Sequence, residues 1–242
     1  MATLRWQSLL MGRWPARTLA GIAIAWTSTG AGEPLQVAAA SNFQGALEVL
    51  KADFHGEIVA TYGSSGLLYA QLVQGRRFDV FLSADAARPR ALVNRARAHS
   101  PIAYATGRLV LVVNHGKPGV DWFAADRRVA LANPETAPYG RAAAETMRRL
   151  GAASKRVNAL NVAQAFHFAA SGAVDGAFAA LAQVVAQDIS PDRYWLVPEH
   201  LHTPIEQVGV VVAGPNQRVA REFMDYLGSE RARKVIRKAG YR

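Results

Sequence analysis

Short apolar runs alternate with amphipathic stretches along most of the chain. Three of the runs are each followed by a stretch whose apolar residues recur at helical spacing, and they span residues 35–40, 57–62 and 79–82. Apolar runs of this length, bounded by turn residues, are typical of buried strands. Strands that alternate with helices predict a mainly parallel sheet with right-handed crossovers.

The same alternation starts again near residue 108 and continues to the end of the chain. The further predicted strands are 108–113, 128–132, 175–179, 195–197 and 206–213. The further predicted helices start near Tyr139 and Asn161 or cover 216–227 and 229–238. We therefore expect an α/β protein with two lobes, in which each lobe is a mainly parallel sheet flanked by helices. The first lobe is expected to hold residues 33–112 and 208–242, the second 113–207, with the strands 108–113 and 206–213 as the hinge.

Polar residues stand where the first three predicted strands end and helices begin. Ser41 follows the first strand, Ser65 lies in a Gly-Ser-Ser-Gly turn after the second, and Asp85 follows the third. Ligands of parallel α/β sheets bind outside the carboxyl ends of the strands. A helix that begins there offers free N–H groups and the positive end of its dipole. The corners at Ser41 and Ser65 are therefore candidate anion sites, with ordinary capped helices as the alternative.

Residues 1–32 have the features of a signal peptide. Arg5, Arg13 and Arg17 make the start positive, and no acidic residue precedes Glu33. The apolar stretch 19–26 is too short for a stable membrane anchor. Small residues follow it, which predicts cleavage near residues 31–32 and an exported mature protein.

The charge of the chain is basic but scattered. The formal net charge is +10, and removal of the leader takes away three arginines and no acid, which leaves +7. Because the basic residues are not interleaved with aromatic ones, we expect general attraction of anions and no groove for nucleic acid. The sequence contains no cysteine, so no disulfide stabilises the exported protein.

Four motifs carry a family resemblance that covers nearly all of the mature sequence. They are Ala-Ala-Ser-Asn-Phe at 39–43, Tyr-Gly-Ser-Ser-Gly at 62–66, Phe-Asp-Val-Phe-Leu-Ser-Ala-Asp at 78–85 and Asn-Pro-Glu-Thr-Ala-Pro-Tyr-Gly at 133–140. The chain resembles the periplasmic molybdate-binding proteins of molybdate ABC transporters. This resemblance implies the type II periplasmic-binding-protein fold, with molybdate or tungstate held between the lobes by neutral hydrogen-bond donors. It also implies a periplasmic monomer without a cofactor, which passes the anion to a membrane permease and is not an enzyme.

The resemblance assigns five binding residues. Ser41 and Ser65 match the hydroxyl ligands of the first lobe, Asn42 matches a main-chain and side-chain donor, and Val162 matches a main-chain donor. Many members of the family place a binding tyrosine in the strand equivalent to Gly176–Ala180, which here reads Gly-Ala-Phe-Ala-Ala. We expect Tyr139 to supply the missing hydroxyl. A packing role for Tyr139 at the start of its helix is the alternative.

The expected donors favour one kind of ligand. A site made only of donors suits a fully deprotonated dianion, whereas hydrogen phosphate brings an O–H that needs an acceptor. Sulfate or a small organic acid on the same fold is the alternative, because the sequence does not give the size of the cavity.

Two other classes of protein fit less well. An exported hydrolase would need a nucleophile elbow, but the turn at 63–67 lacks the second glycine of the G-x-S-x-G pattern. A binder of metal cations would need clustered ligands, and the one close histidine pair, His200 and His202, stands in a proline-flanked loop expected at the surface. We therefore expect neither catalysis nor a bare metal ion.

Overall fold

The computed structural model describes residues 33–242. The predicted signal peptide and its cleavage site lie outside these residues. Within the described part, no helix combines the length and the apolar character needed to cross a membrane.

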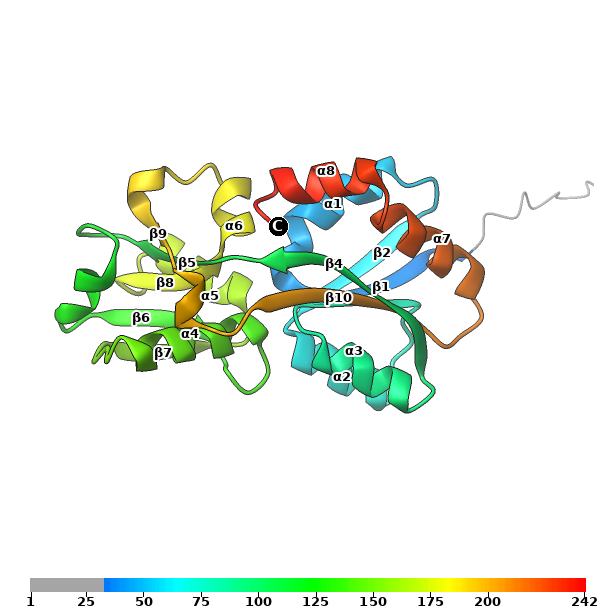
Figure 1. Ribbon diagram of the computed structural model, residues 1–242, viewed down its shortest axis with the longest axis horizontal. Coiled ribbons are helices and arrows are strands. Elements are labelled where there is room, and N and C mark those ends of the chain that lie inside the picture. The colour runs from blue at the N-terminus through cyan, green and yellow to red at the C-terminus, as the bar shows by residue number, and fades with distance from the viewer. Residues whose placement is uncertain (1–32) are drawn as a thin grey trace, which may run out of the picture. The chain divides into compact units, whose positions relative to one another are not determined.

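Strands and helices alternate along the described chain (Figure 1). The strands are β1 (Leu35–Ala40), β2 (Ile58–Gly63), β3 (Val80–Ser83), β4 (Ala98–Gly107), β5 (Leu109–Val113), β6 (Arg128–Ala132), β7 (Lys155–Ala159), β8 (Gly176–Ala180), β9 (Tyr194–Leu196) and β10 (Ile205–Val212). The α-helices are α1 (Gln44–Asp53), α2 (Ser65–Val73), α3 (Ala87–Asn94), α4 (Pro138–Arg149), α5 (Val162–Ala170), α6 (Leu181–Ala186), α7 (Gln217–Leu227) and α8 (Glu230–Lys238).

The first sheet is mixed and has the strand order β2-β1-β3-β10-β4. The predicted parallel arrangement holds for β1, β2 and β3, whereas β10 runs antiparallel to both β3 and β4. β10 is reversed because the chain enters it from the second lobe, at the carboxyl edge of the parallel strands. β4 was not predicted, since this edge strand carries small and polar residues and includes Pro101 instead of an apolar run.

Alternating residues of the first sheet pack against helices on its two faces. Val37 and Ala39 contact the core formed with α1, α7 and α8, whereas Ala38 between them belongs to the core formed with α2 and α3. In β10, Val211 packs in the core with α1, α7 and α8, and Val210 packs in the core with α2 and α3. Figure 1 shows the two groups of helices on opposite sides of the strands. The continuous apolar runs of the sequence therefore reflect burial on both faces.

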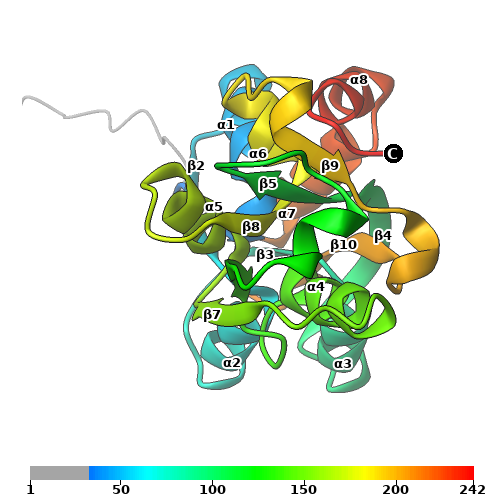
Figure 2. The same cartoon turned by 90° about the vertical axis from the view of Figure 1, so that its left-hand side faces the viewer.

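The second sheet repeats this plan with the order β7-β6-β8-β5-β9. β6 is parallel to β7 and β8, and β5 is antiparallel to β8 and β9. Leu109 and Leu111 pack with α4, whereas Val110 and Val112 pack with residues of α5 and α6. Figure 2 shows α4 on one side of this sheet and α5 and α6 on the other.

The chain crosses between the sheets earlier than predicted. β4 ends at Gly107 and β5 begins at Leu109, so Arg108 alone separates the two strands. β5 pairs only with strands of the second sheet, so residues 109–112 lie in the second lobe. Their predicted place in the first lobe was wrong. The error arose because β4 was not recognised. The movement of the two lobes about this crossing stays a prediction.

The start of α4 packs directly on the end of β6. A Cβ added at Gly140 would overlap the carbonyl oxygen of Ala132 and lie 2.6 Å from its carbonyl carbon. Only glycine permits this approach of two backbones. The approach fixes the neighbouring Tyr139 at the edge of the second sheet.

We expect Gly140→Ala to lower the free energy of unfolding by about 1–3 kcal/mol, because the end of β6 must move to admit the methyl group. Alanine favours a helix over glycine, so helix propensity alone predicts the opposite sign. Gly214→Ala is the matched control, since a Cβ there meets nothing within 4 Å. Urea denaturation measures both variants, and equal stabilities would contradict the close approach.

Candidate functional site

A small pocket lies between the carboxyl ends of the strands of the two sheets. Its cavity volume is about 10 Å³. All the binding residues expected from the sequence line it, namely Ser41, Asn42, Ser65, Tyr139 and Val162. The other lining residues are Ala40, Gly63, Ser64, Ala84, Ala137 and Pro138. The structure thus brings the predicted residues together from segments far apart in the sequence.

A larger hollow beside Arg77 and Pro215 lies at the opposite edge of the first sheet. Two of its charged groups bond within the protein: Asp79 Oδ2 accepts from the N–H of Gln36 at 2.8 Å, and Arg97 Nη1 donates to the carbonyl of Val73 at 2.9 Å. No residue expected from the sequence lines this hollow. The small pocket is therefore the candidate site.

Ser41 and Asn42 form the first corner, in the 3-10 turn that joins β1 to α1. The side-chain amide Nδ2 of Asn42 donates to Gln207 Oε1 at 2.8 Å and to Tyr241 Oη at 2.9 Å. Both hydrogens of this amide are thus used within the protein. A side-chain contact from Asn42 to a ligand would break one of these bonds. The main-chain N–H is the donor that Asn42 can offer without rearrangement.

Ser65 and Ser64 form the second corner, where β2 meets α2. The hydroxyl of Ser65 accepts from the N–H of Ala84 at 2.9 Å, which leaves its own hydrogen to donate. Ser64 occupies the N-cap position of α2 but makes no capping bond, and its Oγ is buried without a hydrogen-bond partner. Buried hydroxyls rarely lack a partner. Ser64 is therefore a further polar group at this pocket, which the sequence reasoning missed although the residue stands in the same motif.

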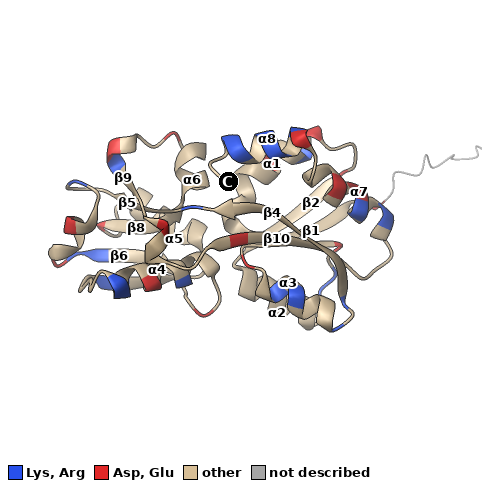
Figure 3. Ribbon diagram, viewed as in Figure 1, with Lys and Arg blue, Asp and Glu red and all other residues tan. Residues whose placement is uncertain are grey.

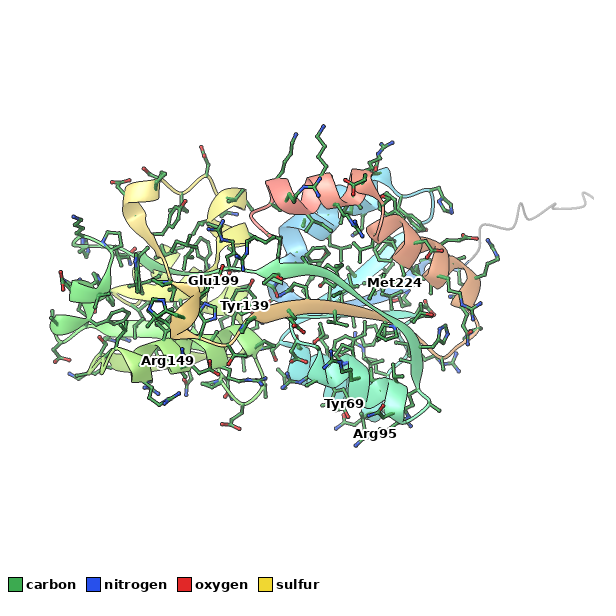
Figure 4. The ribbon with its side chains drawn as sticks, in the orientation of Figure 1. Tyr69, Arg95, Tyr139, Arg149, Glu199 and Met224 are labelled. Atoms are coloured by element: carbon green, nitrogen blue, oxygen red, sulfur yellow. The ribbon has the colours of Figure 1, made fainter. Side chains whose placement is uncertain are left out.

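Tyr139 lies in the first turn of α4, and its hydroxyl is also buried without a partner. The hydroxyl lies against Gly107, where an added Cβ would overlap it. Figure 4 shows Tyr139 near the end of β10 that faces the second sheet. Burial raises the pKa of this hydroxyl well above its ordinary value, and the nearby Tyr241 and Tyr104 raise it further. Tyr139 therefore stays protonated and able to donate.

Val162 is the first residue of α5 and is buried. The preceding Asn161 caps the helix, because its Oδ1 accepts from the N–H of Gln164 at 3.0 Å. The N–H of a first helical residue has no acceptor within its own helix. Val162 can therefore offer a main-chain donor, which is the group that the family resemblance assigns to it.

No charged side chain is found among the described residues that line the pocket. Asp85 lies outside this lining: its Oδ1 accepts from the N–H of Arg88 at 2.9 Å and its Oδ2 pairs with the Arg88 guanidinium. Figure 3 shows lysine and arginine mainly on helices such as α3, α4, α7 and α8. Among residues 33–242, no lysine or arginine thus lines the pocket, although Arg88 lies beside it.

Within residues 33–242 there is no group of three or more side chains suited to hold a metal ion. Of the histidine pair, His200 is exposed as expected, whereas His202 is buried and its Nδ1 lies 2.8 Å from the carbonyl oxygen of Thr203. His202 is a part of the packed loop that leads into β10.

Contacts between the lobes close one side of the pocket. The N–H of Gly66, in α2, donates to the carbonyl of Thr136, in the loop before α4, at 2.8 Å. Arg88 Nη2 donates to the neighbouring carbonyl of Glu135 at 3.3 Å. Gly66 has no room for a side chain, since a Cβ would lie 2.6 Å from the Thr136 oxygen. The lobes therefore meet backbone to backbone beside the pocket.

Comparisons with known proteins show the family and the fold of the chain. A family described as bacterial extracellular solute-binding protein matches residues 35–242. The molybdate-binding protein ModA of Rhodobacter capsulatus is 34% identical over 249 residues, which cover 97% of each chain. ModA of Azotobacter vinelandii is 34% identical over 226 residues, 86% of this chain and 89% of that protein. The solved periplasmic molybdate-binding protein of Azotobacter vinelandii matches with a TM-score of 0.80 and 35% identity, covering 86% of this chain and 98% of that one, which confirms the predicted two-lobed fold.

We expect Tyr139→Phe to raise the free energy of unfolding of the empty protein by about 1 kcal/mol, because it removes a buried hydroxyl that has no partner. Tyr226→Phe is the matched control, since the Tyr226 hydroxyl donates to Asp53 Oδ2 at 2.8 Å and its loss should destabilise. Thermal unfolding without added anions compares the two. A Tyr139→Phe variant less stable than the parent would mean that the hydroxyl has a partner in the empty protein.

Proposed function

The chain belongs to the bacterial extracellular solute-binding proteins, and from this membership we propose that it captures molybdate or tungstate between its lobes and delivers the anion to the permease of an ABC transporter. The relatives named molybdate-binding proteins support this ligand and agree with the resemblance carried by the four sequence motifs. Ser41, Ser65 and Tyr139 would supply hydroxyl donors. Asn42 and Val162 would supply main-chain N–H groups.

The neutral pocket is the observation that carries the proposal. Its polar side chains are hydroxyls and one amide, its other lining residues are small or apolar, and helices begin around it. Helix starts bind anions through free N–H groups and the dipole, so no cation is required. A dianion without hydrogens matches this set of donors. Hydrogen phosphate needs an acceptor for its O–H, and none of the lining side chains is a carboxylate.

The remaining parts of the proposal concern where and how the protein works. The family is extracellular by description and one relative is periplasmic by name, which agrees with the features of residues 1–32. We propose that the mature protein acts in the periplasm as a monomer, without a cofactor and without catalysis. Its partners are then the anion and the membrane permease.

We expect the purified mature protein to bind one molybdate or one tungstate per chain and to reject phosphate. Isothermal titration with molybdate, tungstate, sulfate and phosphate measures this directly. Phosphate bound as tightly as molybdate would contradict the donor-only site. If sulfate bound more tightly than molybdate and tungstate, the proposed ligand would be sulfate.

We expect Tyr139→Phe to weaken molybdate binding by about 1.5–3 kcal/mol, or roughly ten- to a hundredfold, if the hydroxyl donates to the charged anion. The same variant is expected to be more stable than the parent when empty, so a loss of affinity could not be attributed to unfolding. Tyr226→Phe should bind as the parent does. If Tyr139→Phe bound molybdate as tightly as the parent, Tyr139 would be a packing residue. No tyrosine hydroxyl would then replace the one that the Gly176–Ala180 strand lacks.

A further inference from the structure

The last two residues of the chain reach the corner that holds Ser41 and Asn42. Tyr241 is buried, and its ring lies 5.6 Å from that of Phe43 in an edge-on arrangement. Its Oη donates to the carbonyl oxygen of Asn42 at 2.7 Å and accepts from Asn42 Nδ2 at 2.9 Å. One hydroxyl thus holds both the side chain and the backbone of the same residue.

Gln207 completes this buried cluster from β10. Its Oε1 accepts the second hydrogen of the Asn42 amide at 2.8 Å, and its own Nε2 donates to the carbonyl of Ile205 at 3.1 Å. Asn42 and Gln207 are 2% and 0% exposed, so water does not compete for these bonds. Asn42 is therefore held from two sides, by the C-terminus and by the strand at the crossing between the lobes.

Tyr241 is itself anchored by the residue that follows it. The backbone of Arg242 exchanges two hydrogen bonds with Thr106 in β4, at 2.6 and 3.0 Å. The Arg242 guanidinium pairs with Glu199, 2.5 Å away, which lies in the segment between β9 and β10. Figure 4 shows Glu199 beside the same crossing as Tyr139. The end of the chain therefore contacts the binding corner and both segments that pass between the lobes.

The two hydrogen bonds between Tyr241 and Asn42, here called the clamp, matter for binding. The main-chain N–H of Asn42 is the donor that this residue can offer to a ligand. If the carbonyl of Asn42 turned toward the pocket, the negative end of a peptide dipole would face the anion. The bond from Tyr241 Oη opposes this rotation, and the bonds to Nδ2 fix the side chain that would have to move with it.

We propose that Tyr241 is a positioning residue for anion binding, which acts through Asn42 by holding its peptide groups in the orientation that the anion requires. This inference rests on the proposed function. It assigns to the C-terminal residue pair a part in ligand binding that the sequence motifs do not contain.

The test is molybdate titration of Tyr241→Phe, which keeps the ring and deletes the clamping hydroxyl. We expect affinity to fall about tenfold, since the variant loses both hydrogen bonds to Asn42 and the orientation that they impose. Tyr226→Phe, which loses one hydroxyl bond remote from the pocket, is the control for stability. A purely structural role for Tyr241 would lower the melting temperature of both variants and leave the Kd of both at the parent value.

A double-mutant cycle identifies the route of the effect. If Tyr241 acts through Asn42, Asn42→Ala combined with Tyr241→Phe should lose less affinity than the product of the two single losses. Fully multiplicative losses, or a Tyr241→Phe variant that binds like the parent, would overturn the proposal. Should Tyr241→Phe not fold, Tyr241→Met, which also lacks the hydroxyl, takes its place, and parental affinity in that variant would overturn the proposal. A parent that binds no molybdate would instead refute the proposed function.

Discussion

The structure depends on the convergence of helix starts from both lobes on one small volume. The first N–H groups of a helix have no acceptors within the helix, and together they carry a partial positive charge. Here Ser65, Tyr139 and Val162 stand in the first turns of α2, α4 and α5 and all line the same pocket. An anion between them would meet donors in a pocket that no lysine or arginine of the described chain lines. In each sheet, the helices that follow the parallel strands begin at the edge where the two sheets meet.

Small residues make this convergence sterically feasible. Most of the lining residues are alanine, glycine or serine, so backbones approach the pocket closely. Gly140 allows α4 to start on the end of β6, and Gly107 leaves room for the Tyr139 hydroxyl. The arrangement also has a cost, because the hydroxyls of Ser64 and Tyr139 are buried without partners. Unsatisfied groups of this kind are expected where function, not stability, determines the residue.

The parts of the fold that depend on local pattern were predictable from the sequence. The corners at Ser41 and Ser65 follow from an apolar run, a turn and helical spacing within a few neighbouring residues. β4 was not predictable in this way, because its small and polar residues form a strand only through pairing with β10. The clamp of Asn42 by Tyr241 joins residues 199 positions apart, and no local pattern indicates it. Gln207 offered a weak signal, as a polar residue in the apolar run of β10.

We expect closure of the lobes and binding of the anion to be linked through the same segments. The loop that carries the Thr136 carbonyl leads directly into α4, so the bond from Gly66 to Thr136 and the approach of Tyr139 to the pocket would form together on closure. One hydrogen bond between backbones contributes only about 0.5–1.5 kcal/mol, which does not strongly favour the closed arrangement by itself. A ligand shifts such an equilibrium only by its differential affinity for the two states. Tyr139 and Val162 belong to one lobe, and Ser41 and Ser65 belong to the other. An anion could therefore bond to all four residues only in the closed state. These additional bonds would supply the difference in affinity between the two states.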